Sequence, residues 1–354
     1  MKRILLTGGG TAGHVTPNIA LIPRLKELGY EISYAGSYDG IEKGLIQAEG
    51  IPYYGISSGK LRRYKDLKNL TDPFKVMKGY GQARRLIKQL KPNIIFSKGG
   101  FVTVPIVLAA KHLHIPVIIH ESDLTPGLAN KIAIPAASAV CCNFPETIPH
   151  LPEGRAVLSG SPIRQALFEG TKEGGLKRTG LTGEKPILLQ IGGSIGSVFI
   201  NETLRRLLPD LLKDFQIIHL CGKGNLSPSC ESLKGYVQYE YAGEELADLF
   251  AAADLVISRA GANAICELLA LKKPNILIPL SLNASRGDQI LNAESFKKQG
   301  FSYVIKEEDV TDELLLSSIK EVYENRQTYI DAMNASTQLD PIGTITGLIE
   351  QFSK

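Results

Sequence analysis

Short apolar runs alternate along this chain with longer segments in which apolar residues recur every three or four positions. Runs of the first kind are typical of buried strands, and segments of the second kind predict helices with one buried face. Such an alternation favours parallel sheets that are covered on both faces by helices. In the first half of the chain the pattern predicts strands at 4–7, 31–35, 94–97, 117–120 and 139–142 and helices at 17–28, 74–90 and 103–113.

A second series of the same kind begins at Pro186. The stretch 151–185 before it is rich in glycine, proline and charge and contains no long periodic segment, which is typical of a domain junction. We therefore expect an α/β protein of two Rossmann-like, doubly wound domains facing a cleft, at 1–160 and 161–335, with a C-terminal helix in 336–354 packing back on the first. The second series predicts strands at 187–191, 216–221, 237–241, 255–258 and 275–279 and helices at 198–212, 244–252, 263–271, 289–299 and 341–352.

A glycine-rich turn occurs twice, at 8–14 and at 192–197, each time directly after an apolar strand. Glycine lets the backbone turn sharply and approach a ligand, and the start of the following helix favours anions such as phosphate. Two copies indicate two nucleotide-binding-like domains and a nucleotide-activated sugar as donor. The first copy also fits G-x-G-x-x-G, but the second strand ends in Ala35-Gly36-Ser37 without the acid that a dinucleotide cofactor requires.

Composition places the chain among soluble two-domain proteins. It has 354 residues, of which 44% are hydrophobic and 21% charged, and no apolar run approaches the ~20 residues that cross a bilayer. The start is too short for a signal peptide, so we expect a cytoplasmic protein. The five cysteines form no CxxC pair, which agrees with a reducing compartment and disfavours structural zinc.

The net charge of +4 is unevenly distributed. Residues 60–91 contain eleven basic residues and only two acids, Asp66 and Asp72, with apolar residues such as Phe74 and Met77 among them. A solvated helix face and a surface resting on an anionic membrane both fit this pattern. Nucleic acid fits less well, because no nucleic-acid motif accompanies the stretch.

His14 stands at the end of the first glycine-rich turn, where the next helix begins. A neutral imidazole there is suited to take a proton from an acceptor hydroxyl or to orient it. The alternative interpretation is a structural histidine that only forms hydrogen bonds.

The residues Thr7 to Pro17, TGGGTAGHVTP, resemble the opening signature of the MurG-type transferases. These enzymes move N-acetylglucosamine from UDP-N-acetylglucosamine (UDP-GlcNAc) to lipid I, which makes lipid II for peptidoglycan. The resemblance implies a GT-B glycosyltransferase whose N-terminal half binds the lipid acceptor and whose C-terminal half binds the UDP-sugar. It continues in order through 99–102, 120–123, 126–127, 130–131, 160–164, 192–194, 258–262, Glu267, 288–289 and 292–293.

The resemblance also implies roles for individual residues. His14 is the expected base, with Glu121 as its rival, and Glu267 is expected to hold the ribose. Arg164 and Ser194 would contact the donor diphosphate and Gln289 its sugar, while backbone near Gly243 would read the uracil. Further donor-binding positions are Thr11, Ala12 and Gly13 at the cleft edge and Ala262 and Asn263 beneath the nucleotide.

The implied reaction is an inverting displacement at the anomeric carbon, without a cofactor or an obligatory metal ion. The implied partners are UDP-GlcNAc, a polyprenyl-pyrophosphate-linked muramoyl peptide and the anionic cytoplasmic face of the bacterial cell membrane, with no nucleic acid. Ala12, Phe101 and Ser122-Asp123 depart from the family pattern of Gly, Tyr and Gln-Asn. These departures leave open the alternative that the protein is a UDP-sugar transferase that acts on another lipid or small acceptor. A more remote alternative is an epimerase or a non-catalytic sugar-nucleotide-binding protein.

Overall fold

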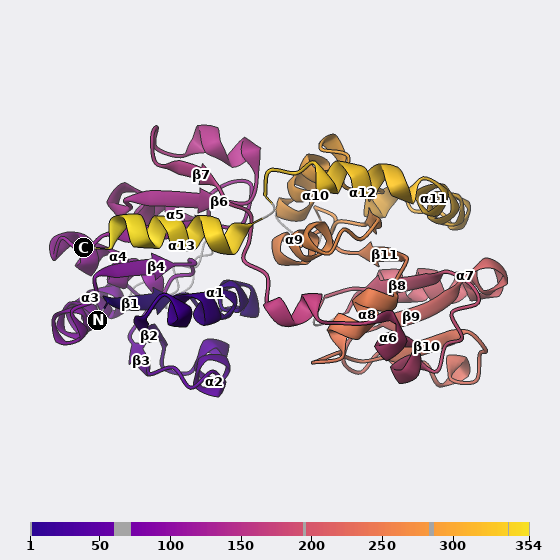
Figure 1. The fold of residues 1–354 in the computed structure, drawn as a ribbon, viewed down its shortest axis with the longest axis horizontal. Coiled ribbons are helices and arrows are strands. Elements are labelled where there is room, and N and C mark those ends of the chain that lie inside the picture. The colour runs from indigo at the N-terminus through magenta and orange to yellow at the C-terminus, as the bar shows by residue number, and fades with distance from the viewer. Residues whose placement is uncertain (1, 60–71, 194–195, 283–286, 339, 354) are drawn as a thin grey trace. The chain divides into compact units, whose positions relative to one another are not determined.

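A computed structural model describes residues 2–59, 72–193, 196–282, 287–338 and 340–353. The chain forms two compact units (Figure 1). Unit 1 comprises Met1–Arg164 and Asp340–Lys354, and unit 2 comprises Gln165–Leu339. Both changes of unit come a few residues after the boundaries expected at 160 and 335.

Unit 1 is built on a parallel sheet of seven strands. Its strands are β1 (Lys2–Thr7), β2 (Tyr30–Ser37), β3 (Tyr53–Ile56), β4 (Ile94–Ser97), β5 (Val117–Glu121), β6 (Ala139–Cys142) and β7 (Ala156–Leu158), and they lie in the order β3-β2-β1-β4-β5-β6-β7. Its helices are α1 (Thr16–Glu27), α2 (Ile41–Ala48), α3 (Asp72–Leu90), α4 (Thr103–His112), α5 (Leu128–Ala133) and α13 (Pro341–Phe352).

Alternate residues of β1 belong to two cores, one on each face of this sheet. Leu5 packs with residues of α3 and α4, whereas Ile4 and Leu6 pack with residues of α1, α2 and α13. Period-two alternation in a strand buried on both faces has this result. The last helix, yellow in Figure 1, belongs to the second core through Ile345 and Ile349.

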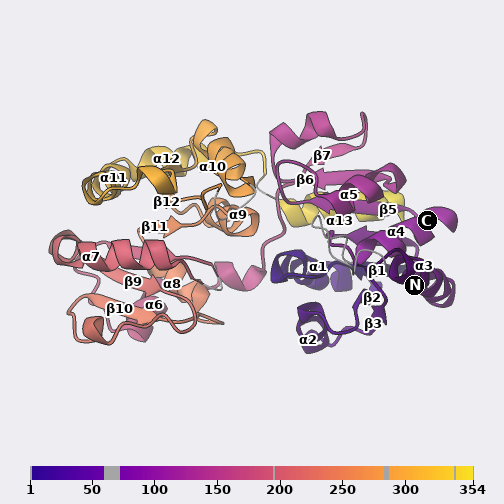
Figure 2. The same ribbon diagram turned by 180° about the vertical axis from the view of Figure 1, so that it is seen from behind.

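Unit 2 repeats the plan with six parallel strands (Figure 2). They are β8 (Ile187–Ile191), β9 (Gln216–Leu220), β10 (Tyr236–Tyr239), β11 (Leu255–Ser258), β12 (Asn275–Leu277) and β13 (Tyr303–Val304), in the order β10-β9-β8-β11-β12-β13. The helices are α6 (Lys172–Thr179), α7 (Val198–Asp214), α8 (Leu246–Ala252), α9 (Ala262–Ala270), α10 (Asp288–Lys298), α11 (Asp312–Glu324) and α12 (Arg326–Asn334).

Each sheet has a point at which the strand order reverses, between β1 and β4 in unit 1 and between β8 and β11 in unit 2. In open α/β sheets ligands bind beyond the carboxyl ends of the strands at such a point. Both glycine-rich turns follow a strand that borders this reversal. The two Rossmann-like units therefore confirm the predicted fold class, and five predicted elements, among them β4, β8 and α13, have the predicted bounds.

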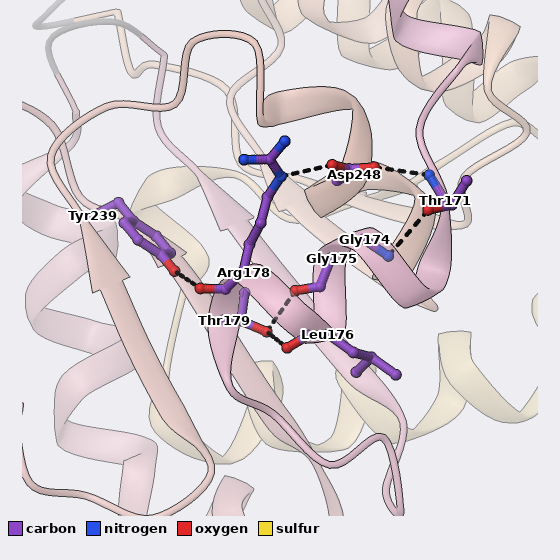
Figure 3. Close-up of polar contacts among 8 residues, drawn as sticks. All are labelled: Thr171, Gly174, Gly175, Leu176, Arg178, Thr179, Tyr239 and Asp248. Carbon is purple, nitrogen blue, oxygen red and sulfur yellow. Dashed lines mark hydrogen bonds and ion pairs between the residues drawn. The ribbon is translucent and has the colours of Figure 1, made fainter.

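The stretch 151–185, in which the sequence shows no long periodic segment, contains β7 and α6. Gly174 and Gly175 weaken the helical pattern of α6 in the sequence, because glycine is a poor helix former. Their small size instead permits close packing against α8, since a Cβ on Gly175 would clash with the carbonyl oxygen of Asp248 and lie 2.6 Å from Cβ of Ala252. The Asp248 carboxylate accepts hydrogen bonds from Thr171 N (2.9 Å) and Arg178 Nε (2.7 Å), which fixes the contact (Figure 3).

The α6–α8 contact predicts that Gly175→Ala destabilises the protein by about 1–3 kcal/mol, the usual cost of overpacking. The matched control is Gly44→Ala in α2, where a Cβ would meet no atom within 4 Å. That change should be neutral or stabilising by up to ~1 kcal/mol, because alanine favours a helix. Chemical denaturation of both variants checks this, and equal midpoints would contradict the proposed close packing.

Candidate active site

The first glycine-rich turn and the end of β1 before it are held by hydrogen bonds to their carbonyl groups. Thr7 O accepts from the backbone N–H of Lys98 (2.9 Å), and Gly8 O accepts from the hydroxyl of Tyr34 (2.8 Å). The loop after β4 packs directly on the turn, because a Cβ on Gly100 would clash with the carbonyl oxygen of Gly9. Gly100 also has φ +91°, which favours glycine. The two loops at the strand-order reversal of unit 1 thus form one tightly packed structure.

His14 ends a 3₁₀ turn (Ala12–His14) that connects the glycines to α1. Its Nδ1 lies 3.0 Å from Gly9 O and 3.2 Å from Thr11 Oγ1. A carbonyl oxygen only accepts, so Nδ1 carries the proton in the neutral ring and Nε2 keeps a lone pair. Burial, and secondarily the charge of Lys98, lower the pKa of His14 below its ordinary value. The imidazole is therefore neutral near pH 7 and has the form that a general base requires.

A buried lysine lies behind this turn. Lys98 is 1% exposed, and its ammonium contacts Nδ1 of His120 (2.8 Å) and Oγ of Ser122. Nε2 of His120 lies 2.8 Å from Gly160 O and must donate to it, so Nδ1 accepts from Lys98. Burial and the neighbouring ammonium lower the pKa of His120 well below its ordinary value. The serine that departs from the family pattern is thus a direct partner of Lys98.

Glu121 organises the loop that follows β5. Its carboxylate accepts from Asp123 N (3.0 Å), Gly127 N (3.0 Å) and Asn130 Nδ2 (2.8 Å), and the residue is 4% exposed. These three hydrogen bonds direct the carboxylate oxygens into the loop and toward the start of α5. This geometry favours a structural role for Glu121 and leaves His14 as the better candidate base.

The other candidates in unit 1 lie at its surface. Thr11 and Ala12 are exposed and Gly13 is half-buried. Arg164, the last residue of the first segment of unit 1, is half-buried, and its Nε has no hydrogen-bond partner among the described residues. Its guanidinium therefore retains donor capacity, which suits an anion.

In unit 2 the second glycine-rich turn leads into α7. Ser194 lies outside the described residues. Ser197 caps α7 by accepting from Ile200 N (3.4 Å), and its Oγ also accepts from Arg259 Nη2 (2.6 Å). A Cβ on Gly196 would clash with the carbonyl oxygen of Cys221. The turn therefore packs against both the end of β9 and the loop after β11.

Arg259 connects these loops and was missed as a site residue, although it stands inside a motif block. It is 7% exposed, donates through Nη1 to Ile278 O (3.0 Å) and forms an ion pair with Glu307. Burial lowers the pKa of Arg259, and Glu307 opposes this effect. One buried cation thus ties the loops after β8, β11 and β12 together. Its burial depends on contacts distant in sequence, so no local pattern indicates it.

The predicted sugar contact, Gln289, lies in the first turn of α10. Its Oε1 accepts from Ala260 N (3.3 Å) and Leu280 N (3.2 Å), which orients the amide and directs the NH₂ group away from these loops. Helix α9 starts nearby at Ala262 without a side-chain cap.

Ala262, Asn263 and Glu267 lie in the first two turns of α9 and are half-buried. Gly243 is exposed in the loop between β10 and α8, where its carbonyl oxygen accepts from Leu246 N. In the described part of the chain no three His, Cys, Asp or Glu side chains are grouped to hold a metal ion. The expected metal-free reaction stays a prediction.

Comparison with known proteins decides the family. Residues 4–142 match the glycosyltransferase family 28 N-terminal domain, and residues 187–343 match the glycosyltransferase family 28 C-terminal domain. The chain belongs to glycosyltransferase family 28. The two matches cover β2 to β6 and most of β1 in unit 1, all six strands of unit 2 and both glycine-rich turns of this family 28 chain.

Two relatives of this family 28 chain carry the same name. Proteins of Lachnoclostridium phytofermentans (66% identical over 99% of both chains) and Lachnospira eligens (64% over 100% of both) are named UDP-N-acetylglucosamine--N-acetylmuramyl-(pentapeptide) pyrophosphoryl-undecaprenol N-acetylglucosamine transferase. The crystal structure of Acinetobacter baumannii MurG is similar with a TM-score of 0.79 and 26% identity, over 99% of this chain and 100% of that one. The MurG-type resemblance is confirmed.

The loop role of Glu121 predicts that Glu121→Gln lowers stability by roughly 1–3 kcal/mol, because one buried N–H loses its acceptor. The pH at which kcat/KM falls on the acid side should not move. Denaturation and a pH–rate profile check both points, with exposed Glu153→Gln as the control. Loss of the fall in kcat/KM on the acid side, together with a large drop in kcat, in Glu121→Gln but not in Glu153→Gln would instead identify Glu121 as the base.

Proposed function

We propose that this family 28 transferase moves N-acetylglucosamine from UDP-GlcNAc to the muramoyl 4-hydroxyl of polyprenyl-pyrophosphate-linked muramoyl peptide, converting lipid I to lipid II. Relatives at 59–66% identity over almost the whole chain are named for this transfer. The observation that carries the proposal is the hydrogen bonding of the two ring nitrogens of His14. Its Nδ1 is engaged by Gly9 O, and no described residue bonds to its Nε2, which is ready to accept a proton.

Unit 2 holds the donor in this proposal. Glu267 accepts from the ribose hydroxyls, backbone near Gly243 reads the uracil, and the NH₂ group of Gln289 donates to the sugar. The start of α9 at Ala262 and Asn263 lies beneath the nucleotide, and helix starts favour phosphate. Ser194, Arg164 and the edge formed by Thr11, Ala12 and Gly13 complete the contacts with diphosphate and sugar.

The reaction is a single displacement at the anomeric carbon. The acceptor oxygen forms a bond to that carbon, the bond to the UDP oxygen breaks, and its electron pair leaves with UDP. The acceptor proton passes to Nε2 of His14. Arg164 donates to the leaving diphosphate as its charge grows, because a guanidinium fork matches phosphate oxygens.

The role of His14 predicts that His14→Ala lowers kcat at least roughly a hundredfold, the low end of what a positioned base contributes. UDP affinity should stay within twofold, because His14 does not hold the nucleotide. Glu267→Ala is the matched contrast and should weaken UDP binding roughly tenfold or more through lost hydrogen bonds to a charged acceptor. Turnover of UDP-GlcNAc with a short-chain lipid I analogue, together with calorimetry of UDP binding, measures both effects. Full turnover by His14→Ala would remove it as the base.

We also propose that α3 docks on the anionic cytoplasmic face of the cell membrane. Phe74 and Met77 are 73% and 71% exposed and lie three positions apart, so they share one face at the start of the helix. Exposed Lys75, Lys78 and Arg84 are close by in the same helix. Apolar side chains beside cations suit an anionic lipid surface. The basic residues at 60–68 lie outside the described residues, and no helix within the described ranges is long and apolar enough to span a bilayer.

This surface predicts that the double variant Phe74→Ser, Met77→Ser binds vesicles with 30% anionic lipid at least roughly tenfold more weakly, because each buried apolar side chain contributes ~1.5–3 kcal/mol. Leu226→Ser, which changes a 45% exposed leucine of unit 2, is the control and should bind as the wild type does. Vesicle sedimentation at two salt concentrations measures this. Unchanged binding by the double variant would contradict docking through α3.

A further inference from the structure

A carboxylate without an assigned role lies buried beside the first glycine-rich turn. Glu42, in the first turn of α2, is 0% exposed. Three glycines from separate positions leave room for its side chain. A Cβ on Gly9 would lie 2.5 Å from Oε1, one on Gly36 would lie 2.9 Å from Cγ, and one on Gly40 would clash with the carboxylate. The segments after β1, at the end of β2 and before α2 thus all enclose this one group.

Glu42 is ionised. Oε1 accepts from the backbone N–H (3.0 Å) and the hydroxyl (2.5 Å) of Ser37, and Oε2 accepts from the N–H of Gly10 (3.3 Å). Burial alone would raise the pKa of Glu42, but these hydrogen bonds outweigh it and lower the pKa below its ordinary value. The first turn, which the sequence predicts to favour an external anion, thus directs its Gly10 N–H to an internal one.

The N–H of Gly10 and the C=O of Gly9 belong to one peptide group. The N–H donates to Glu42, and the C=O accepts from Nδ1 of His14 at 3.0 Å. The two ends of a trans peptide point in opposite directions, so one rigid, planar unit connects the carboxylate to the imidazole. Consecutive hydrogen bonds polarise one another, and a carboxylate at one end makes the carbonyl at the other a stronger acceptor.

We propose that Glu42 is a positioning residue for His14 that acts through the Gly9–Gly10 peptide; this inference rests on the proposed role of His14 as the base. The carboxylate fixes the peptide, the peptide carbonyl holds the proton on Nδ1, and Nε2 is left to accept the acceptor proton. As Nε2 gains that proton, the imidazolium is stabilised through the same peptide.

Two charged groups of opposite sign act on His14 from different elements. Glu42, from α2, raises its pKa, and Lys98, from the loop after β4, lowers it more. Among the described residues, the other polar groups in contact with the ring are Gly9 O and Thr11 Oγ1. Removing the charge of Glu42 therefore lowers the pKa of His14 further, and the acid limb of kcat/KM moves to lower pH. The weaker base also transfers the proton more slowly on the plateau.

The test compares Glu42→Gln with Glu49→Gln, the same change at an exposed position at the end of α2. The pKa of His14 is followed by NMR of ¹⁵N-histidine-labelled full-length protein, with His14→Ala assigning the signal among six histidines. The pH profiles of kcat and kcat/KM are measured with UDP-GlcNAc and the lipid I analogue. In Glu42→Gln we expect a lower pKa of His14, and the fall of kcat/KM on the acid side should begin at lower pH. We also expect kcat on the pH plateau to decrease roughly tenfold, which is a fraction of the ~10²–10⁴ that a general base contributes. KM for UDP-GlcNAc and all values of Glu49→Gln should match the wild type.

The outcomes separate the two proposals. If the pKa of His14 is unchanged in folded Glu42→Gln, the proposal that Glu42 acts on His14 through the Gly9–Gly10 peptide is wrong, whatever the role of His14. If the pKa of His14 is lowered but the acid side of the kcat/KM profile does not move, Glu42 does act on His14 through the peptide, but His14 is not the base. The wild type gives an independent test that needs no variant. If Glu42 acts through the Gly9–Gly10 peptide, the neutral ring of His14 must carry its proton on Nδ1. A ¹⁵N spectrum with the proton on Nε2 would overturn this proposal even if Glu42→Gln does not fold.

Discussion

The carbonyl group of Gly9 is the point on which the arrangement of unit 1 depends. It accepts from His14, and the absence of a side chain on Gly100 lets the loop after β4 pack against it. The peptide group to which it belongs donates on its other side to Glu42. A side chain at either glycine would separate the loops at the strand-order reversal, and with them the imidazole and its partners. Close approach of neighbouring groups thus explains Gly8 and Gly9 of the first turn, and the positive φ of Gly10 (+90°) explains the third glycine.

The second glycine-rich turn also depends on the close approach of backbone segments, but different side chains hold it in place. Gly196 approaches the end of β9, and Ser197 both caps α7 and accepts from the buried guanidinium of Arg259. A buried cation that satisfies carbonyl, hydroxyl and carboxylate groups on separate loops fixes their spacing, because leaving any of these groups unpaired is costly. Unit 1 holds its site with a buried carboxylate and lysine, and unit 2 holds its site with a buried arginine.

Much of the fold follows from the sequence, because strands buried on both faces are continuous apolar runs. Strands β4 and β8 are predicted with their observed bounds for this reason, and helix α13 is predicted because its apolar residues recur every three or four positions. Helices α2, α5, α6, α11 and α12 are missed. Helices α2 and α6 are each eight residues long and contain glycine, so that packing on neighbours rather than helical propensity stabilises them. Missing α2 also hides Glu42. Its burial depends on glycines on other segments, which a local pattern does not connect. Likewise His14 can be predicted from its place beside the turn, whereas its tautomer and the bonds of Glu121 require coordinates.

The account is tested most directly by the product of a single turnover. Enzyme loaded with UDP-GlcNAc labelled in the sugar is mixed with a short-chain lipid I analogue, quenched within one catalytic cycle, and analysed for the fate and anomeric configuration of the label. The account predicts that the label moves to the muramoyl 4-hydroxyl in a β linkage, opposite to the α linkage of the donor. Retention of the α configuration, or label that stays on UDP or passes only to water, would contradict it.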